Sequence, residues 1–155
     1  MTNPRTGYPD GYFIYLVKQV EMGMRRPFEE LIARHGISTP GYTALNVLQF
    51  RPGITSSELA RRSFVRAQTM AETISALGAA GLVRREKDPD HGRQILLFNT
   101  EAGVACVADI AAEISRLESR MMDGLGDDER AELVRALRTV RDALAVISHG
   151  DRAPA

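Results

Sequence analysis

The segment from Thr55 to Gly81 constrains the fold of this chain more than any other part of the sequence. Thr55 precedes Glu58 by three residues, and this capping-box spacing predicts that a short helix begins here. Ser63-Phe64-Val65 then makes a tight connection, and a longer helix is predicted over residues 66–80. Gly81 is suited to end that helix, because glycine readily adopts the left-handed conformation of a helix cap. Two helices joined by such a short turn are typical of a helix-turn-helix.

A charged hairpin is predicted directly after this pair of helices. Residues 82–85 and 94–98 are rich in strand-forming side chains, and the loop 87–93 between them contains Pro89 and Gly92. The sequence therefore predicts a mainly α-helical fold with a small β-hairpin wing, in the order of a winged helix-turn-helix.

The start of the longer helix carries polar side chains that suit a nucleic acid. A helix of about 15 residues is roughly 22 Å long, and its N-terminal end fits a major groove about 12 Å wide. Gln68 can bond adenine through both groups of its amide, and Arg66 can meet guanine or phosphate. Ser56 and Ser57 open the short helix, where hydroxyls and backbone N–H groups suit a phosphate. The residues expected at DNA, the last three from the hairpin, are Ser56, Ser57, Arg66, Ala67, Gln68, Thr69, Glu72, Lys87, His91 and Arg93.

Long apolar stripes lie on both sides of this unit. Residues 10–34, 100–122 and 127–147 each carry an apolar side chain every three or four positions. An isolated winged helix does not need these helices, so we expect them to join two copies of the chain. The expected organisation is a single domain over 1–155, with a DNA-binding lobe at 36–100 and dimerisation helices at 10–35 and 101–148.

One further helix is predicted between the first stripe and the helix-turn-helix. Thr39 is its expected N-cap and Pro40 its first helical residue. Its expected buried face consists of Tyr42, Leu45, Leu48 and Phe50.

Charge and composition narrow the class of protein. The formal net charge is zero, yet residues 51–95 hold eight basic against five acidic side chains, so the middle of the chain is mildly basic. No apolar run approaches the ~20 residues that span a membrane. Cys106 is the single cysteine and cannot form an internal disulfide, which favours a reducing cytoplasm. We expect no membrane association.

Several segments, in this order along the chain, resemble the MarR-type (multiple antibiotic resistance regulator) repressors. The resemblance covers residues 10–148, and the segments that carry it are 35–40, 57–70, 79–85, 88–93 and 100–103. The sequence departs from the family pattern at three places. Arg66-Ala67 replaces a small polar cap, which removes about 1 kcal/mol from the stability of the helix predicted over 66–80. Gly92 stands where a second wing arginine is common, and Asn99 replaces a leucine.

The resemblance implies a homodimer, joined by its first and last helices, on a pseudo-palindromic DNA site near its own promoter. It also implies a small-molecule effector, often phenolic or lipophilic, bound between the dimerisation helices and the DNA-binding lobe. Side chains that can line such a pocket between the first two helices are Tyr12, Phe13, Tyr15, Tyr42 and Asn46, although such residues also serve as core or dimer interface.

Alternative functions remain open at this point. Glu72 and the zero net charge suit a winged-helix protein-interaction module without DNA readout, and the tyrosines give thin support to a small enzyme. We expect no catalytic residue, no cofactor and no metal, because no His/Cys/Asp cluster has metal-ligand spacing. Cys106 is better explained as a small buried residue than as a peroxide sensor, since no cationic neighbour lowers its pKa.

Individual arginines also have two interpretations. Arg93 is expected at DNA, and its alternative is a salt bridge to Asp88 or Asp90 that shapes the loop. The other arginines of the lobe suit either phosphate contact or ordinary surface charge, and they are Arg61, Arg62, Arg84 and Arg85.

Overall fold

The computed structural model describes residues 7, 9 and 11–150, without the side chains of 148–150. Asp10, the predicted start of the first helix, lies outside the described residues, as does the tail after Gly150. Contacts divide the chain into two compact units, Met1–Ile114 and Ser115–Ala155. The elements are α1 (Tyr12–Ala33), α2 (Thr39–Phe50), α3 (Ser56–Arg62), α4 (Ala67–Ala79), β1 (Val83–Lys87), β2 (Ile95–Asn99), α5 (Glu101–Met121) and α6 (Asp127–Gly150).

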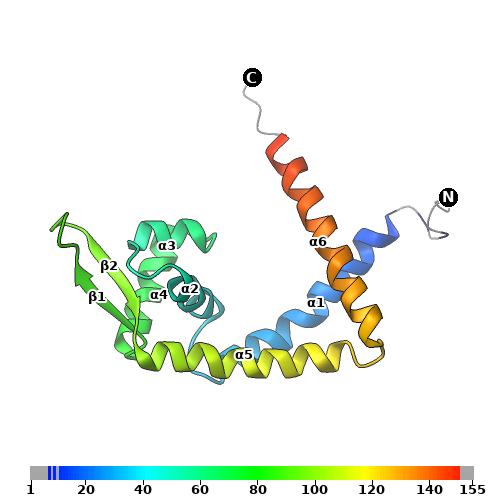
Figure 1. The fold of residues 1–155 in the computed structure, drawn as a ribbon, viewed down its shortest axis with the longest axis horizontal. Helices are drawn as coiled ribbons and strands as arrows, with labels where there is room; N and C mark the ends of the chain where they lie inside the picture. The colour runs from blue at the N-terminus through cyan, green and yellow to red at the C-terminus, as the bar shows by residue number, and fades with distance from the viewer. Residues whose placement is uncertain (1–6, 8, 10, 151–155) are drawn as a thin grey trace. The chain divides into compact units, whose positions relative to one another are not determined.

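The predicted fold class is confirmed: the described residues form helices and one two-stranded antiparallel hairpin (Figure 1). Val83 pairs with Asn99 and Lys87 with Ile95 at the two ends of the hairpin. Ile54 forms an isolated antiparallel bridge with Leu97, whose N–H donates to the Ile54 carbonyl at 3.0 Å, and Gly53 N–H donates to the Leu97 carbonyl at 2.9 Å. The connection between α2 and α3 is thereby tied to the base of the wing.

The start of α2 differs from the prediction by one residue. Ser38, not Thr39, is the N-cap, and its hydroxyl accepts the Gly41 N–H at 3.2 Å. Thr39 is the first helical residue, and Tyr42 N–H bonds to the Ser38 carbonyl. The Ser38 hydroxyl satisfies one of the N–H groups that a helix leaves unpaired at its first turn.

The start of α3 confirms one half of the predicted capping box. The Thr55 hydroxyl accepts the Glu58 N–H at 3.3 Å. The Glu58 carboxylate bonds instead to the guanidinium groups of Arg61 and Arg62 on the same helix. Charge-assisted bonds to two guanidinium groups are stronger than a return bond to a neutral backbone N–H, so the carboxylate bonds to the arginines.

The core of the first unit is built from aliphatic side chains of several elements. Its largest fully buried members are Ile32, Leu45, Leu48, Leu59, Met70, Leu97 and Ile110. The prediction that Phe50 is buried was wrong, because 78% of this residue is exposed. Gly41, Ala44, Leu45 and Leu48 share one face of α2 at helical spacing, and Phe50, the last residue of that helix, lies off it.

Two polar links join elements far apart in the sequence. The Asn99 amide at the end of β2 donates to the Leu45 carbonyl of α2 at 2.8 Å. After α1, the Arg34 guanidinium donates to the Glu113 carboxylate at 2.6 Å, and His35 Nε2 lies 2.9 Å from the other oxygen of that carboxylate. The hydrogen bonds from Arg34 and then from His35 lower the pKa of the Glu113 carboxyl.

In the second unit, acidic side chains open α6 as predicted. The Glu129 carboxylate accepts the Gly126 N–H at 2.8 Å, and Arg130 Nε donates to the Leu125 carbonyl at 3.0 Å. Acidic groups are favourable at this end of a helix because of the helix dipole. Across the described residues, no helix has the length and apolar character needed to cross a membrane.

Candidate nucleic-acid interface

The first two turns of α4 carry the polar residues that were predicted to read DNA. Gln68 and Thr69 in the first turn and Glu72 in the second are all exposed. The opposite face of the same helix is held in the core by Met70, Thr73, Ile74 and Leu77. The Gln68 amide donates to the Glu72 carboxylate at 3.4 Å, so these two side chains lie side by side on the exposed face.

Arg66 precedes α4 as its N-cap. Its backbone is extended, with φ −67° and ψ 149°, and its side chain makes no capping hydrogen bond. The predicted loss of a side-chain cap is therefore confirmed. Because the first N–H groups of a helix have no acceptor within the helix, the start of α4 keeps backbone donors as well as an exposed guanidinium.

The wing loop is organised by Asp88. Its backbone N–H donates to the Gln94 carbonyl at 3.0 Å, and its carboxylate accepts the Asp90 N–H at 2.9 Å. The same carboxylate lies 3.8 Å from His91 Nδ1. Within the described residues Arg93 has no ion-pair partner, so the alternative of a salt bridge to Asp88 or Asp90 is not the one the structure adopts. Lys87, His91 and Arg93 are all exposed.

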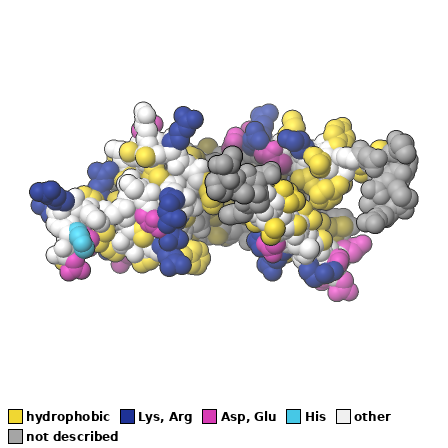
Figure 2. Space-filling view, turned by 90° about the horizontal axis from the view of Figure 1, so that it is seen from above, with side chains coloured by type: hydrophobic (Ala, Val, Ile, Leu, Met, Phe, Trp, Pro, Cys, Tyr) yellow, Lys and Arg dark blue, Asp and Glu magenta, His cyan; other side chains and the backbone are white. Residues whose placement is uncertain are grey.

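Other arginines of the lobe have partners within the chain. Arg84 pairs with Glu86 and places its guanidinium 4.5 Å from the ring centre of Phe98. Arg61 and Arg62 share Glu58, and the hydrogen bond from Arg61 is the main cause of the lowered pKa of that carboxyl. Figure 2 shows that Lys and Arg side chains are scattered over the face in view rather than massed on it.

The residues predicted to line an effector pocket lie in different surroundings. Tyr12, Phe13 and Tyr15 are exposed in the first turn of α1. Tyr42 meets the Phe28 ring edge-on, with ring centres 6.4 Å apart. Asn46 donates to the Tyr42 carbonyl at 3.0 Å and lines a cavity on the surface of α2.

Cys106 is half-buried, and burial raises the pKa of its thiol, with a smaller contribution from Asp109. A raised pKa disfavours the reactive thiolate. Among the residues that the structure describes, no three His, Cys, Asp or Glu side chains gather as a metal site would require.

The sequence reasoning missed two exposed phenylalanines next to the helix-turn-helix. They are Phe50 at the end of α2 and Phe64 in the turn before α4. A signal for Phe64 was present, because it stands directly after the C-cap of a short helix, where glycine is usual.

Comparison with known proteins places this lobe in a family. Residues 35–94 match the model described as MarR family. The chain is 28% identical to the HTH-type transcriptional regulator TtmR of Methylorubrum extorquens, over 94% of this chain and 74% of that protein. It is 29% identical to the HTH-type transcriptional repressor Rv2887 of Mycobacterium tuberculosis, over 83% of this chain and 91% of the relative.

A solved structure agrees with these relatives. The PcaV transcriptional regulator of Streptomyces coelicolor superposes with a TM-score of 0.64 at 27% identity, over 83% of this chain and 96% of that one. These relatives are named as transcriptional regulators, which favours DNA binding over an interaction module that lacks DNA readout. The chain belongs to the MarR family and is a DNA-binding transcriptional regulator built on a winged helix.

Proposed function

We propose that this protein is a homodimeric repressor that binds a pseudo-palindromic operator and leaves it when a small molecule binds. The observation that carries the proposal is the exposed polar first turn of α4 beside a wing with exposed Lys87 and Arg93. This arrangement matches a helix that enters a major groove while the wing reaches an adjacent minor groove.

Each DNA contact in the proposal has a chemical reason. Gln68 bonds adenine in a bidentate manner, Arg66 bonds guanine or a phosphate, and Glu72 accepts from the amino group of cytosine. Ala67 and Thr69 contact thymine methyl groups or base edges beside them. Ser56 and Ser57 hold a phosphate at the start of α3, and the wing adds Lys87, His91 and Arg93.

Exposed apolar side chains support the proposed dimer. In the first unit α1 exposes Ile14 (64%) and Met22 (69%), and in the second unit α6 exposes Val146 (74%). Apolar surface of this kind is typical of a protein–protein interface. We therefore assign dimerisation to 10–35 and 101–148 and DNA binding to 36–100, within one domain. Two recognition helices about 34 Å apart then match one turn of DNA.

The effector part of the proposal concerns Tyr12, Phe13, Tyr15, Tyr42 and Asn46. An effector shifts the protein away from DNA only by its difference in affinity for the two dimer geometries. A compound screen by thermal shift, followed by DNA release at the same concentrations, tests this part.

Fluorescence anisotropy with the protein's own upstream region tests the DNA part. The upstream duplex is compared with a scrambled duplex of equal composition, at several salt concentrations. We expect tighter binding to the upstream duplex and a linear fall of log affinity with log salt. Equal affinity for both duplexes, or no salt dependence, refutes sequence-specific readout.

Two variants assign the contacts within the same assay. Gln68→Ala is expected to reduce the binding free energy by about 1–3 kcal/mol on the upstream duplex only. Arg93→Ala is expected to weaken binding to both duplexes and to reduce the salt slope by about 1. Arg120→Gln, a surface arginine near the end of α5, is the control and should change neither value. Unchanged affinity in Arg93→Ala would show that the wing does not contact DNA.

A further inference from the structure

Glu72 places a carboxylate on the exposed face of α4 that also carries Gln68 and Thr69. The phosphates of DNA repel a carboxylate, so a glutamate here weakens binding to duplexes of every sequence. A group of this kind raises selectivity when it disfavours the wrong bases more than the right one. The contacts of Glu72 determine which bases those are.

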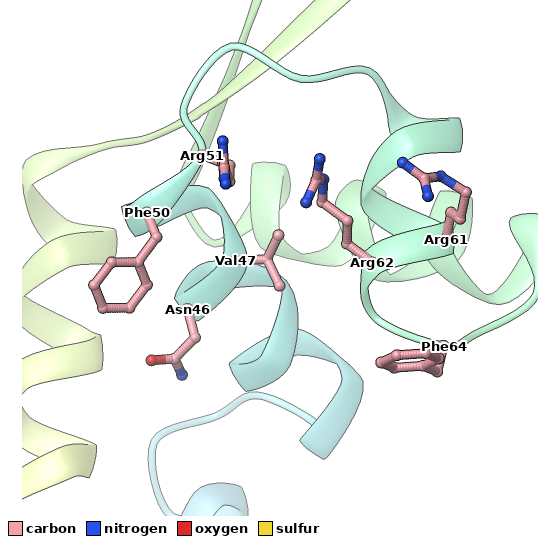
Figure 3. Close-up of a pocket in the computed structure, with 7 residues that line it drawn as sticks. All are labelled: Asn46, Val47, Phe50, Arg51, Arg61, Arg62 and Phe64. Carbon is pink, nitrogen blue, oxygen red and sulfur yellow. The ribbon is translucent and has the colours of Figure 1, made fainter. Parts of the chain in front are cut away.

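The partner of the Glu72 carboxylate is an amide and not a cation. The other carboxylate of the helix-turn-helix, Glu58, bonds Arg61 and Arg62, whose side chains line the cavity shown in Figure 3. Glu72 forms no ion pair within the part of the chain that the structure describes, and the Gln68 amide donates to it at 3.4 Å. The two residues are four positions apart, where side chains are neighbours on the surface of a helix.

The carboxylate determines which end of the Gln68 amide faces it. A carboxylate only accepts hydrogen bonds, whereas the amide of glutamine has an NH2 group with two donors and an oxygen that only accepts. The amide oxygen is therefore turned away from Glu72, and one N–H is directed at it. The second N–H and Oε1 of Gln68 remain, side by side in the plane of the amide, for another partner.

An N–H beside an oxygen matches the edge of adenine and opposes that of guanine. In the major groove adenine presents an acceptor at N7 and a donor at N6, whereas guanine presents acceptors at N7 and O6. Oε1 of Gln68 would lie against one of the two guanine acceptors. A glutamine without a neighbouring carboxylate avoids this by turning both N–H groups toward guanine and its oxygen away. Glu72 prevents that turn because it occupies one of the two N–H groups.

The backbone beneath this pair is held in the core. Met70 and Thr73 on the opposite face of α4 are buried, and the Thr73 hydroxyl donates to the Thr69 carbonyl at 2.8 Å. Gln68 and Glu72 therefore keep a separation of about 6 Å along the helix axis. An amide that is already oriented also loses less side-chain entropy on binding than a free one does.

We propose that Glu72 is a positioning residue that makes Gln68 select adenine and reject guanine. One N–H of the Gln68 amide stays on the Glu72 carboxylate, while the other N–H and Oε1 bond N7 and N6 of adenine. The second oxygen of the carboxylate is left for a donor such as the amino group of cytosine. This inference rests on the proposed function, because it requires that α4 lies in a major groove.

Selection from a randomised duplex pool by the full-length protein, followed by sequencing, tests the proposal. The parent chain should enrich adenine at one position of each half-site, and Gln68→Ala should lose the preference there. Glu72→Ala and Glu72→Gln should lower the adenine-to-guanine ratio at the same position about tenfold, because alanine holds neither end of the amide and glutamine holds either end. Ser75→Ala, at an exposed polar position further along α4, is the control and should keep the ratio of the parent chain.

The side-chain amide NMR signals of the full-length protein without DNA give an independent measurement. The two N–H protons of Gln68 are identified by their loss in Gln68→Ala. One of them should resonate downfield of its position in Glu72→Ala, because only one is bonded to the carboxylate, and Ser75→Ala should leave both unchanged. A purely structural role of Glu72 would not single out one proton of this amide.

Two sets of results would overturn the proposal. In the selection, Glu72→Ala and Glu72→Gln would keep the adenine preference of the parent chain, or would alter a position that Gln68→Ala leaves unchanged. In the spectra, neither N–H signal would differ between the parent chain and Glu72→Ala. A parent chain that selects no sequence at all refutes the proposed function itself. A parent chain and Glu72 variants that select the same sequence leave that function intact and refute this inference alone.

Discussion

Gly103, in the first turn of α5, is the glycine at which an added methyl group should lower the free energy of unfolding most. A Cβ on this residue would overlap the backbone carbonyl oxygen of Leu82 and would lie 3.2 Å from its carbonyl carbon. That carbonyl cannot turn away freely, because it accepts the Thr100 N–H at 3.0 Å. The Thr100 hydroxyl in turn accepts the Gly103 N–H and donates to the Gly81 carbonyl. Gly103→Ala must therefore push the start of α5 away from the strand.

The size of the effect follows from three contributions. Overpacking against a fixed backbone costs about 1–3 kcal/mol, and weakening the Thr100–Leu82 hydrogen bond costs about 1 kcal/mol. The higher helix propensity of alanine returns up to about 1 kcal/mol. We expect Gly103→Ala to lower the free energy of unfolding by about 2 kcal/mol, which corresponds to about 4–8 °C in Tm for a chain of this size.

Urea denaturation followed by far-UV circular dichroism measures this change. Protein concentration must be the same for every variant, because the stability of a dimer depends on it. Gly78→Ala in α4 is the matched control. Its Cβ would lie 3.9 Å from the Val83 carbonyl, an ordinary contact, so this variant should be as stable as the parent chain or slightly more stable.

The comparison of the two alanine variants decides the matter. If Gly103→Ala is as stable as Gly78→Ala, then the close approach of α5 to the Leu82 carbonyl does not exist in solution. The conclusion that Thr100 and Gly103 hold the start of α5 against the backbone of Leu82 would then be refuted.

Three further predictions concern other parts of the first unit. Glu113 has a lowered pKa in the folded state, so its pairing with Arg34 and His35 contributes stability above the ordinary pKa of 4.5 and loses it as the pH falls through the folded value. Glu113→Gln should therefore be less stable than the parent chain at neutral pH and should approach it below about pH 4.5, and a difference that grows with acid would contradict this. Phe64→Gly should raise the unfolding free energy by up to about 1 kcal/mol by relieving the left-handed conformation of Phe64, whose φ is +55°, whereas a loss of stability would show that the ring packs. Arg66→Ser should gain about 1 kcal/mol from the missing cap of α4 and reduce the salt slope of DNA binding by about 1, and an unchanged slope would place Arg66 away from phosphate.

Local signals predicted much of the fold correctly. The cap at Thr55, the glycine at Gly81 and the loop with Pro89 each specify structure through residues within a few positions of one another. The exposed positions of Gln68 and Arg93 also agree with their predicted place on the first turn of α4 and on the wing.

The sequence alone did not determine the partners of the charged and aromatic side chains of this winged helix. Arg84 lies over Phe98 because register in the hairpin pairs those two residues across the strands. Glu113 meets Arg34 and His35 from a position nearly eighty residues away. Phe50 faces solvent because the core accepts a different face of α2. Caps, turns and helical spacing are properties of neighbouring residues, and the sequence determined them. Burial and ion pairing depend on which surfaces meet after folding, and only the tertiary structure decided those.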